Sequence, residues 1–358
     1  MGLPFLDSAI SRKRDQMVAV DLGTRTTKAV SVQRRGQGLT LCGFALLDAP
    51  IYEKSLTADL LGEHLKAVTE VLRPSTKYVS LTVGVNDAQV RHADMPRMPV
   101  GDMRMVLKLN AKTYLQQDLP GHIFDCHVGT RPQSRTPNGK PQAAAGVAKQ
   151  RVLVAGARKQ LIEDYVQGAK NAGLVADCLV PGLIGPVNTF EKTMPEVFEK
   201  EAIALVDVGF KNSSICILLE GELMLSRVVG IGGDRLSNGL AEALGISYAE
   251  AEGIKVGMPS EVQSQLEGLL LPLGRELRAS IDFFEHQQDR PVMQVFVTGG
   301  SSRSEFIVQK LQQELMVECK VFNPTTFLQL QLPPQQTAEI EQVAPQLTVA
   351  LGAALAAL

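Results

Sequence analysis

The chain has 358 residues, of which 45% are hydrophobic and 21% are charged, and its formal net charge is −2 at pH 7. This length exceeds the size at which one core usually stays undivided, so we expect two domains, or one domain with an insertion. The balanced charge lacks the basic excess that indicates a nucleic-acid-binding protein.

The spacing of the cysteines and the length of the apolar runs argue against two further classes, disulfide-bonded proteins and membrane-spanning proteins. Five cysteines are scattered without Cys-x-x-Cys spacing, which is typical of reduced thiols in a cytosolic protein. No stretch approaches the roughly 18 to 20 uninterrupted apolar residues that a membrane span needs. Residues 1–14 place a short apolar head before a basic cluster, the wrong order for a signal peptide. We expect a flexible N-terminus there, or a weak contact with a membrane surface.

The first predicted element is a hairpin over residues 17–36, MVAVDLGTRTTKAVSVQRRG. Two apolar runs flank a break at Gly23, which predicts two strands around a tight loop. Glycine lets the backbone turn and point its N–H groups at an anion, and nearby hydroxyl and ammonium groups add donors. The candidate phosphate-binding residues are Asp21, Gly23, Thr24, Thr26, Thr27 and Lys28.

A third strand, a helix and a fourth strand follow the hairpin, at residues 39–46, 59–71 and 78–85. Residues 95–173 then behave as an insert that forms a small α/β subdomain. Its expected elements are a helix (101–117), a strand (123–128), a loop (129–142), a strand (151–157) and a helix (159–172). An apolar helical stretch over residues 181–190 leads back to the core of the first domain.

The hairpin repeats over residues 203–222, IALVDVGFKNSSICILLEGE, with Asp207 aligned to Asp21 and Gly209 to Gly23. This copy adds Asn212 and Ser213 as candidate hydrogen-bond donors. The two aspartates supply the acceptor charge that a hydrated Mg²⁺ would need between them. The duplication predicts two similar domains that hold a polyphosphate between their hairpins.

The second half continues with the sequence GIGGD, which opens a helix with Asp234 as its expected cap. Helical sequence follows over residues 248–255 and 261–287. A strand over residues 293–298 ends at Gly299 and Gly300, where the main chain can pass close to a flat base. The helix N-terminus at Ser301 adds donors.

The C-terminal part has four expected features. Ser302 and Glu305 predict a capping box for the next helix. A last short strand lies at residues 321–323, and the Gln- and Pro-rich residues 331–346 suggest a solvated loop. Residues 347–358 form a small-residue helix, which we expect to pack into the first domain instead of anchoring in a membrane, because it lacks Lys and Arg.

Three motifs in order, DLGTRTTK, DVGFKNSS and VTGGSS, resemble the phosphate 1, phosphate 2 and adenosine motifs of the actin, Hsp70 and sugar kinase superfamily. The pair Glu252 and Lys255 is similar to the helical pair that holds ribose and adenine there. The resemblance also implies nucleotide contacts at Gly232 and Gly233. Neither a P-loop nor a complete G-x-G-x-x-G motif competes with this interpretation.

The resemblance implies an α/β protein with an actin-like ATPase fold, in which two RNase H-like domains are duplicated and a small α/β subdomain is inserted in the first. The expected first core domain comprises residues 15–94, 174–200 and 340–358, with the insert at residues 95–173. The expected second core domain comprises residues 201–235 and 290–339, with a helical subdomain at residues 236–289.

Two stretches identify the branch of the superfamily. MPRMPVGDMRMVLKLNAKTYLQQDLPGHIFDCHV and RVLVAGARKQLIEDYVQGAKNAGLVADCLVPGLIGPVNTF resemble the PilM family of type IV pilus assembly proteins, and the resemblance covers residues 15–358. The cell-division protein FtsA carries a similarly placed subdomain, but it characteristically ends in a basic amphipathic membrane helix. This chain ends without one.

The PilM resemblance implies a cytoplasmic scaffold of a type IV pilus or a related secretion machine, with ATP and Mg²⁺ between its domains. It implies that the groove between the first domain and its insert binds the N-terminal cytoplasmic tail of a PilN-like bitopic inner-membrane protein. Other pilus platform and motor proteins are further expected partners. The protein would then lie at the inner face of the inner membrane through these partners.

Two alternatives stay open from the residues. An FtsA-like polymerising protein would form ATP-dependent assemblies, and a small-molecule kinase of the same fold would need an Asp base and larger substrate-shaping insertions. No residue is identified as a catalytic base. Phe210 and Lys211 make the second loop bulky, which predicts slow or absent ATP hydrolysis.

Overall fold

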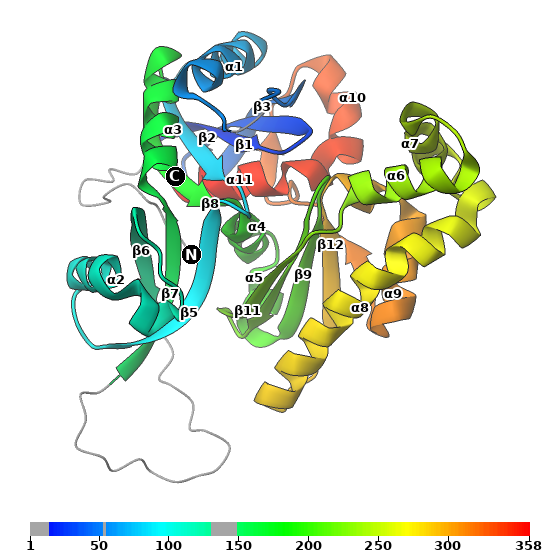
Figure 1. Ribbon diagram of the computed structural model, residues 1–358. Coiled ribbons are helices and arrows are strands. Elements are labelled where there is room, and N and C mark those ends of the chain that lie inside the picture. The colour runs from blue at the N-terminus through cyan, green and yellow to red at the C-terminus, as the bar shows by residue number, and fades with distance from the viewer. Residues whose placement is uncertain (1–13, 53–54, 130–148) are drawn as a thin grey trace.

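Two mixed sheets with the same strand order form the centre of the molecule (Figure 1). The structure is a computed structural model that describes residues 14–52, 55–129 and 149–358. The first sheet has the order β14-β3-β2-β1-β4-β8, and the second has the order β11-β10-β9-β12-β13. Apart from β14, the strands of the two sheets occupy equivalent places, which confirms the predicted duplication.

The strands of each half follow the apolar runs of the sequence. Those of the first sheet are β1 (Gln16–Leu22), β2 (Thr26–Arg35), β3 (Gly38–Asp48), β4 (Tyr78–Val83), β8 (Val175–Pro181) and β14 (Leu328–Leu330). Those of the second are β9 (Ala202–Val208), β10 (Ser213–Leu219), β11 (Glu222–Val229), β12 (Gln294–Thr298) and β13 (Cys319–Val321). In each half the first three strands are antiparallel neighbours, and the fourth runs parallel to the first.

Helices cover both faces of both sheets, which explains why a central strand such as β10 is buried along its whole length. On the first sheet, α1 (Ala58–Leu72) and α3 (Lys159–Asn171) cover one face and α11 (Thr348–Leu355) covers the other. The helices of the second sheet are α4 (Gly185–Thr193) and α5 (Pro195–Lys200) on one face, and α6 (Gly233–Leu244), α7 (Tyr248–Gly257), α8 (Gln263–Gln288) and α9 (Glu305–Leu315) on the other.

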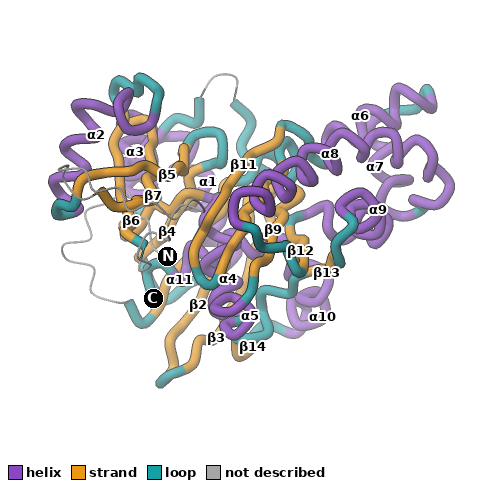
Figure 2. The backbone as a smooth tube through the Cα atoms, turned by 90° about the horizontal axis from the view of Figure 1, so that it is seen from below, coloured by secondary structure: helices purple, strands orange, loops and turns teal. Residues whose placement is uncertain are grey.

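A smaller sheet forms the predicted α/β subdomain, at the opposite end of the molecule from α6 and α7 (Figure 2). Its strands are β5 (Ala88–Pro96), β7 (Lys149–Arg158) and β6 (His122–Val128), in the order β5-β7-β6, and α2 (Val100–Leu115) packs on them. Strand β5 starts before our boundary at residue 95, and α3 packs against α1 of the first half. The domain boundaries stay proposals.

The prediction of a solvated loop at residues 331–346 was wrong. It contains α10 (Pro334–Val343), whose Ile340 is buried in the core of the first half. Gln336 accepts a hydrogen bond from the Phe44 main-chain N at 3.0 Å and donates one to the Phe44 carbonyl at 2.8 Å. A polar side chain thus fixes α10 to strand β3.

Two expected helix caps are also wrong. Asp234 lies inside α6, whose N-cap is Gly232. Ser302 and Glu305 form no capping box, because the short 3₁₀ turn Gly300–Arg303 precedes α9, which starts at Glu305 after Ser304. Strands β5, β8, β11 and β14 and helix α5 were not predicted. Further 3₁₀ turns span Gly182–Ile184, Pro259–Val262 and Ala344–Leu347.

Helix α11 confirms the expected packing of the small-residue C-terminal helix. It lies against α4 and strand β1, and an added Cβ at Gly352 would overlap the main chain of Gly185. Among the helices of the described residues, none has the length and apolar character to cross a bilayer. The predicted loop at residues 129–142 and the expected flexible terminus at residues 1–14 lie almost wholly outside the described residues.

Candidate functional site

The first hairpin places a carboxylate and an ammonium side by side. Asp21, near the end of β1, is paired in register with Lys28 on β2, and Lys28 Nζ lies 3.0 Å from Asp21 Oδ2. Between them the chain turns at Gly23, where an added Cβ would press on the Thr26 carbonyl and on Lys28 Nζ. The predicted glycine is therefore required by a close approach.

A neighbouring strand supports Asp21. Thr82 on β4 donates its hydroxyl to Asp21 Oδ1 at 3.0 Å and accepts a hydrogen bond from the Leu22 main-chain N at 3.3 Å. Both carboxylate oxygens of Asp21 are thus held, one by Lys28 and one by Thr82. Sequence reasoning missed Thr82, although its place at the end of a strand parallel to β1 was a usable signal.

The second hairpin brings Asp207 to the same place from the other half. Asp207 lies near the end of β9 and is paired in register with Ser214 on β10. Burial raises the pKa of Asp207 to about 6; the Lys28 ammonium acts in the opposite direction, and the Asp21 carboxylate adds to the rise. Burial opposes the charge of Lys28, but Asp21 and then Asp207 more than offset it and raise the pKa of that ammonium. Asp21, Lys28 and Asp207 therefore form one charged cluster between the halves.

Gly299, directly after β12, packs closely against Asp207 of the cluster. Its φ is +91°, in the region that favours glycine, and an added Cβ would overlap Asp207 Oδ1. The adjacent Gly300 opens the 3₁₀ turn, where an added Cβ would meet only Gln346 Oε1, at 4.0 Å. Only the first glycine of the predicted pair thus makes a close approach.

Three further candidate glycines of the second half, Gly209, Gly232 and Gly233, meet at its hairpin loop. The Gly233 main-chain N donates to the Gly209 carbonyl at 2.9 Å, and an added Cβ at Gly232 would overlap the Phe210 carbonyl. An added Cβ at Gly233 would lie 2.8 Å from Ser301 Oγ. The loop after β9, the N-terminus of α6 and the turn after β12 therefore meet.

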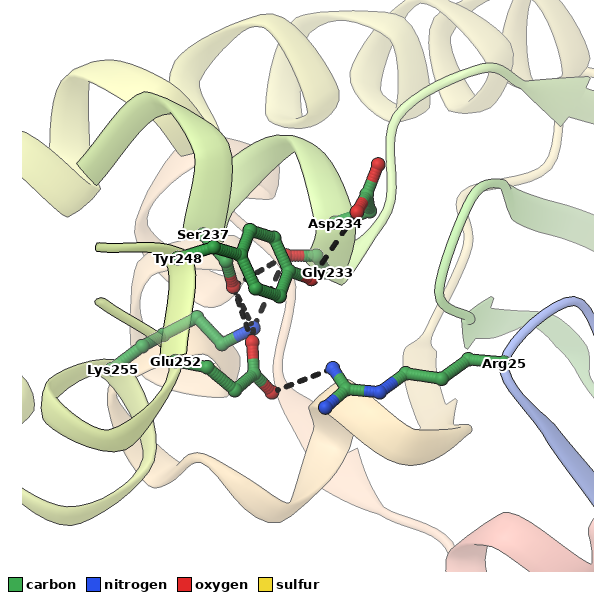
Figure 3. A network of polar contacts seen from close by, with 7 residues as sticks. All are labelled: Arg25, Gly233, Asp234, Ser237, Tyr248, Glu252 and Lys255. Atoms are coloured by element: carbon green, nitrogen blue, oxygen red, sulfur yellow. Dashed lines mark hydrogen bonds and ion pairs between the residues drawn. The ribbon is translucent and has the colours of Figure 1, made fainter. Parts of the chain in front are cut away.

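A buried polar network joins α6 and α7 next to this loop (Figure 3). Lys255 Nζ donates to the Gly233 carbonyl at 3.1 Å, to Ser237 Oγ at 2.7 Å and to Glu252 Oε2 at 2.7 Å. Ser237 also donates to Glu252 Oε2. Burial lowers the pKa of Lys255, whereas Lys255, Ser237 and Arg25 together outweigh burial and lower the pKa of Glu252. Glu252 and Lys255 thus form a fixed network, not a solvated pair.

Arg25 reaches this network from the first half. Its Nη1 atom lies 3.3 Å from Glu252 Oε1, and its guanidinium carbon lies 5.1 Å from the centre of the Phe210 ring. Lys211 is engaged elsewhere, with Nζ 2.6 Å from Asp234 Oδ2, and the Tyr248 hydroxyl donates to Asp234 Oδ1 at 3.2 Å. Sequence reasoning did not select Arg25.

Two predicted side chains point away from the cluster. Thr27 Oγ1 lies 2.7 Å from His64 Nε2 on α1, and Ser213 donates to the Ile231 carbonyl at 2.6 Å. Each is adjacent to the residue that pairs with the aspartate, so strand alternation turns it to the opposite face. Asn212 contributes its carbonyl, which accepts from the Gly209 N at 3.0 Å, and Thr24 is exposed in the first loop.

The donor set suits a hydrated cation better than a protein-caged one. Among the described residues, no group of three or more His, Cys, Asp or Glu side chains could hold a metal ion. Two carboxylates from opposite halves match the needs of Mg²⁺, which keeps several waters and is commonly bound through one or two carboxylates plus substrate phosphates. The raised pKa of Asp207 indicates that this carboxylate would gain from a further cation.

A separate cavity of about 220 Å³ contains none of the predicted site residues. It lies between β5 and β7 of the insert, β11 and α8, and its lining includes His92, Arg151 and Phe283. Burial and then the Arg151 charge lower the pKa of His92 to about 4, although a backbone hydrogen bond involving Leu223 acts in the opposite direction. The insert therefore contacts the second half through a largely neutral histidine.

A family model described as type IV pilus assembly protein PilM matches residues 19–358. Among solved structures, a PilM-PilN type IV pilus biogenesis complex aligns with a TM-score of 0.81 at 20% identity, over 96% of this chain and 99% of the other. The ethanolamine utilization protein EutJ from Carboxydothermus hydrogenoformans aligns with a TM-score of 0.54 at 15% identity, over 98% and 94% of the two chains. MreB5 of Spiroplasma citri bound to AMPPNP aligns with a TM-score of 0.52 at 9% identity, over 95% of each chain. These similarities confirm the predicted actin-like ATPase fold.

Proposed function

Because the chain belongs to the family of the type IV pilus assembly protein PilM, we propose that it is a cytoplasmic ATP-binding scaffold of a type IV pilus or related secretion machine. One observation carries the nucleotide part of this proposal. Asp21, Lys28 and Asp207 come from two halves of the chain and meet in one charged cluster. A ligand held there touches both halves, so its presence can shift their relative arrangement.

The proposed site holds Mg-ATP between the two hairpins. Asp21 and Asp207 would hold Mg²⁺, mainly through its waters, and Lys28 would contact the phosphates. The bound Mg²⁺ would offset the charge of the triphosphate. The other nucleotide contacts would come from main-chain groups and side chains at Gly23, Thr24, Thr26, Gly209, Asn212, Gly232, Gly233, Glu252, Lys255, Gly299, Gly300 and Ser301. Thr27 and Ser213 would not contact the nucleotide directly, but would fix the strands through their hydrogen bonds to His64 and to the Ile231 carbonyl.

We propose slow or absent hydrolysis. Phe210 and Lys211 occupy the second hairpin loop, and Lys211 is committed to Asp234 at 2.6 Å. Hydrolysis requires a group that orients an attacking water, and no residue of the described site is placed in that role. ATP would then act as a conformational ligand.

The proposed partner is a PilN-like inner-membrane protein. The matched PilM structure is a complex with PilN. We expect its N-terminal cytoplasmic segment to bind between the first half and the insert, largely by extended backbone contacts. The protein would thereby lie at the inner face of the inner membrane, with other pilus platform and motor proteins nearby.

Calorimetry with Mg-ATP tests the nucleotide part. Asp21→Asn and Asp207→Asn are expected to weaken binding by about tenfold or more, because each removes a charge-assisted contact. Asp48→Asn, at the exposed end of β3, is the matched control. Unchanged affinity in both site variants would remove these aspartates from the site.

A pull-down tests the partner part. Synthetic N-terminal peptides of PilN-like proteins, with scrambled peptides as controls, are presented with and without Mg-ATP. Retention that depends on the peptide sequence and changes with ATP is expected. If no such peptide is retained in either condition while a sugar acceptor stimulates ATP turnover, the scaffold function is wrong and the kinase alternative is favoured.

A further inference from the structure

One side chain of the first hairpin touches the second half at two places. Arg25 follows Gly23 by two residues in the loop between β1 and β2. Its guanidinium pairs with Glu252 of α7 at 3.3 Å (Figure 3). It also lies over the ring of Phe210, in the second hairpin loop, at 5.1 Å. Arg25 therefore bridges the two halves from the hairpin loop that is proposed to bind phosphate.

Glu252, the carboxylate that Arg25 contacts, is also held by hydrogen bonds that do not involve Arg25. Glu252 Oε2 accepts hydrogen bonds from Lys255 and Ser237, whereas Arg25 lies against the other oxygen, Oε1. Lys255 is also held by Ser237 and by the Gly233 carbonyl. Removing the Arg25 guanidinium would thus leave Glu252 paired, so the bridge can open without exposing an uncompensated buried charge.

Arg25 is also more available than Lys28, the other cation near the loop of its hairpin. Its side chain is 44% exposed, compared with 19% for Lys28, which is paired with Asp21. A guanidinium can bind phosphate oxygens through two parallel charge-assisted hydrogen bonds, whereas the contact of Arg25 with Glu252 is a single one, from Nη1 to Oε1 at 3.3 Å. A phosphate group near the loop would therefore compete with Glu252 for Arg25.

We propose that Arg25 binds the terminal phosphate of a nucleoside triphosphate and pairs with Glu252 when that phosphate is absent. This inference rests on the proposed nucleotide site and assigns it a residue that distinguishes triphosphate from monophosphate. The exchange frees α7 from its contact with the first hairpin, so the number of phosphates changes the contacts between the halves. The energy for that change comes from the difference in Arg25 affinity for its two partners.

Calorimetry with ATP, ADP and AMP, each with Mg²⁺, tests this assignment on the full chain. Arg25→Gln is expected to weaken ATP binding by about tenfold and to change AMP binding by less than about twofold, because only the triphosphate reaches Arg25. Arg35→Gln is the matched control, since Arg35 lies exposed at the far end of the same hairpin, against Gln33. It is expected to bind all three ligands like the wild type.

Each other outcome has a defined meaning. Wild-type ATP affinity in Arg25→Gln, or an equal loss for ATP and AMP, overturns the role of Arg25 but leaves the nucleotide site standing. Absence of ATP binding by the wild type overturns both. As a second readout, the change in hydrogen exchange of residues 248–257 on adding ATP should differ between the wild type and Arg25→Gln, because only the wild type exchanges the Glu252 contact of Arg25 for a phosphate. An identical response in both proteins would contradict the exchange of partners.

Discussion

The two hairpins have the same backbone arrangement but differ in the charged side chains that they carry. In register, Asp21 faces Lys28 in the first hairpin, whereas Asp207 faces Ser214 in the second. The first hairpin thus carries its own cation, and the second depends on the same Lys28 from across the interface. The two copies therefore have a carboxylate at the same position, Asp21 or Asp207, and both carboxylates interact with the single cation Lys28.

The fourth strands show the same divergence. Thr82 on β4 holds the Asp21 carboxylate, but Thr298 on β12, which is paired in register with Asp207, donates to the Pro345 carbonyl at 2.7 Å instead. The first threonine therefore serves the site, and the second fixes the chain that leads into α11. Equivalent positions have acquired different structural tasks.

The largest expected effect is the loss of the shared cation. Lys28→Met leaves Asp21 and the largely buried Asp207 without their common partner, and at pH 8 it should lower the free energy of unfolding by about 4 kcal/mol. Urea denaturation measures it. Ser214→Ala, at the equivalent position of the second hairpin, should cost less than about 1 kcal/mol. Equal losses would break the comparison between the hairpins.

Gly299→Ala is expected to cost about 3 kcal/mol, because alanine is strained at φ +91° and its Cβ would overlap Asp207 and Val208. Gly300→Ala is the control, since an added Cβ there meets no atom closer than 4.0 Å. Thermal or urea unfolding of both variants checks this. A Gly300 variant as unstable as the Gly299 variant would show that the close approach to Asp207 is not the cause.

The insert, which the second half lacks, provides a pH-dependent contact. Because the folded-state pKa of His92 is about 4, below its ordinary value of 6.5, the neutral form stabilises the fold above pH 6.5. That contribution is lost as the pH falls from 6.5 towards 4, by about 2 kcal/mol between pH 7 and pH 5. His92→Gln should lack this part of the pH dependence of unfolding, whereas His286→Gln, exposed on α8, should retain it. Identical pH profiles for wild type and His92→Gln would exclude His92 as the source.

The smallest expected effects separate the two threonines. Thr82→Val and Thr298→Val should each cost about 1 kcal/mol of unfolding free energy, because each removes one buried hydroxyl and leaves its acceptor with other donors. Calorimetry with Mg-ATP should nevertheless distinguish them, with weaker binding for the Thr82 variant alone. Equal ATP affinity would show that Thr82 does not position Asp21.

The duplicated hairpins could be predicted because their signal is local. Each has an apolar run, an Asp-x-Gly turn and a returning run, and both copies form the strands expected. Two candidate residues within them, Thr27 and Ser213, point away from the charged cluster for a local reason that the sequence also contained. In a strand, neighbours of the residue facing an aspartate must point the other way, which places Thr27 and Ser213 on the opposite face.

The remaining differences depend on contacts that are distant in sequence. Helix α10 has one buried position, Ile340, and is fixed by Gln336, so its sequence lacks the apolar stripe that predicts a helix. Thr82 and Arg25 acquire their roles from Asp21 and Glu252 on other elements. The periodicity of a sequence does not predict which side chains from two separate halves will be in contact.

The chain path also sets an order of assembly. The second sheet uses the continuous stretch from β9 to β13, whereas the first sheet needs β14 beside β3, and α11 covers its other face. During synthesis, the half that begins first is therefore completed last, after the second half has left the ribosome. Nascent chains stalled before residue 328 should show a protease-sensitive first half. The nucleotide site, which needs both halves, becomes available only after β14 and α11 have been synthesised.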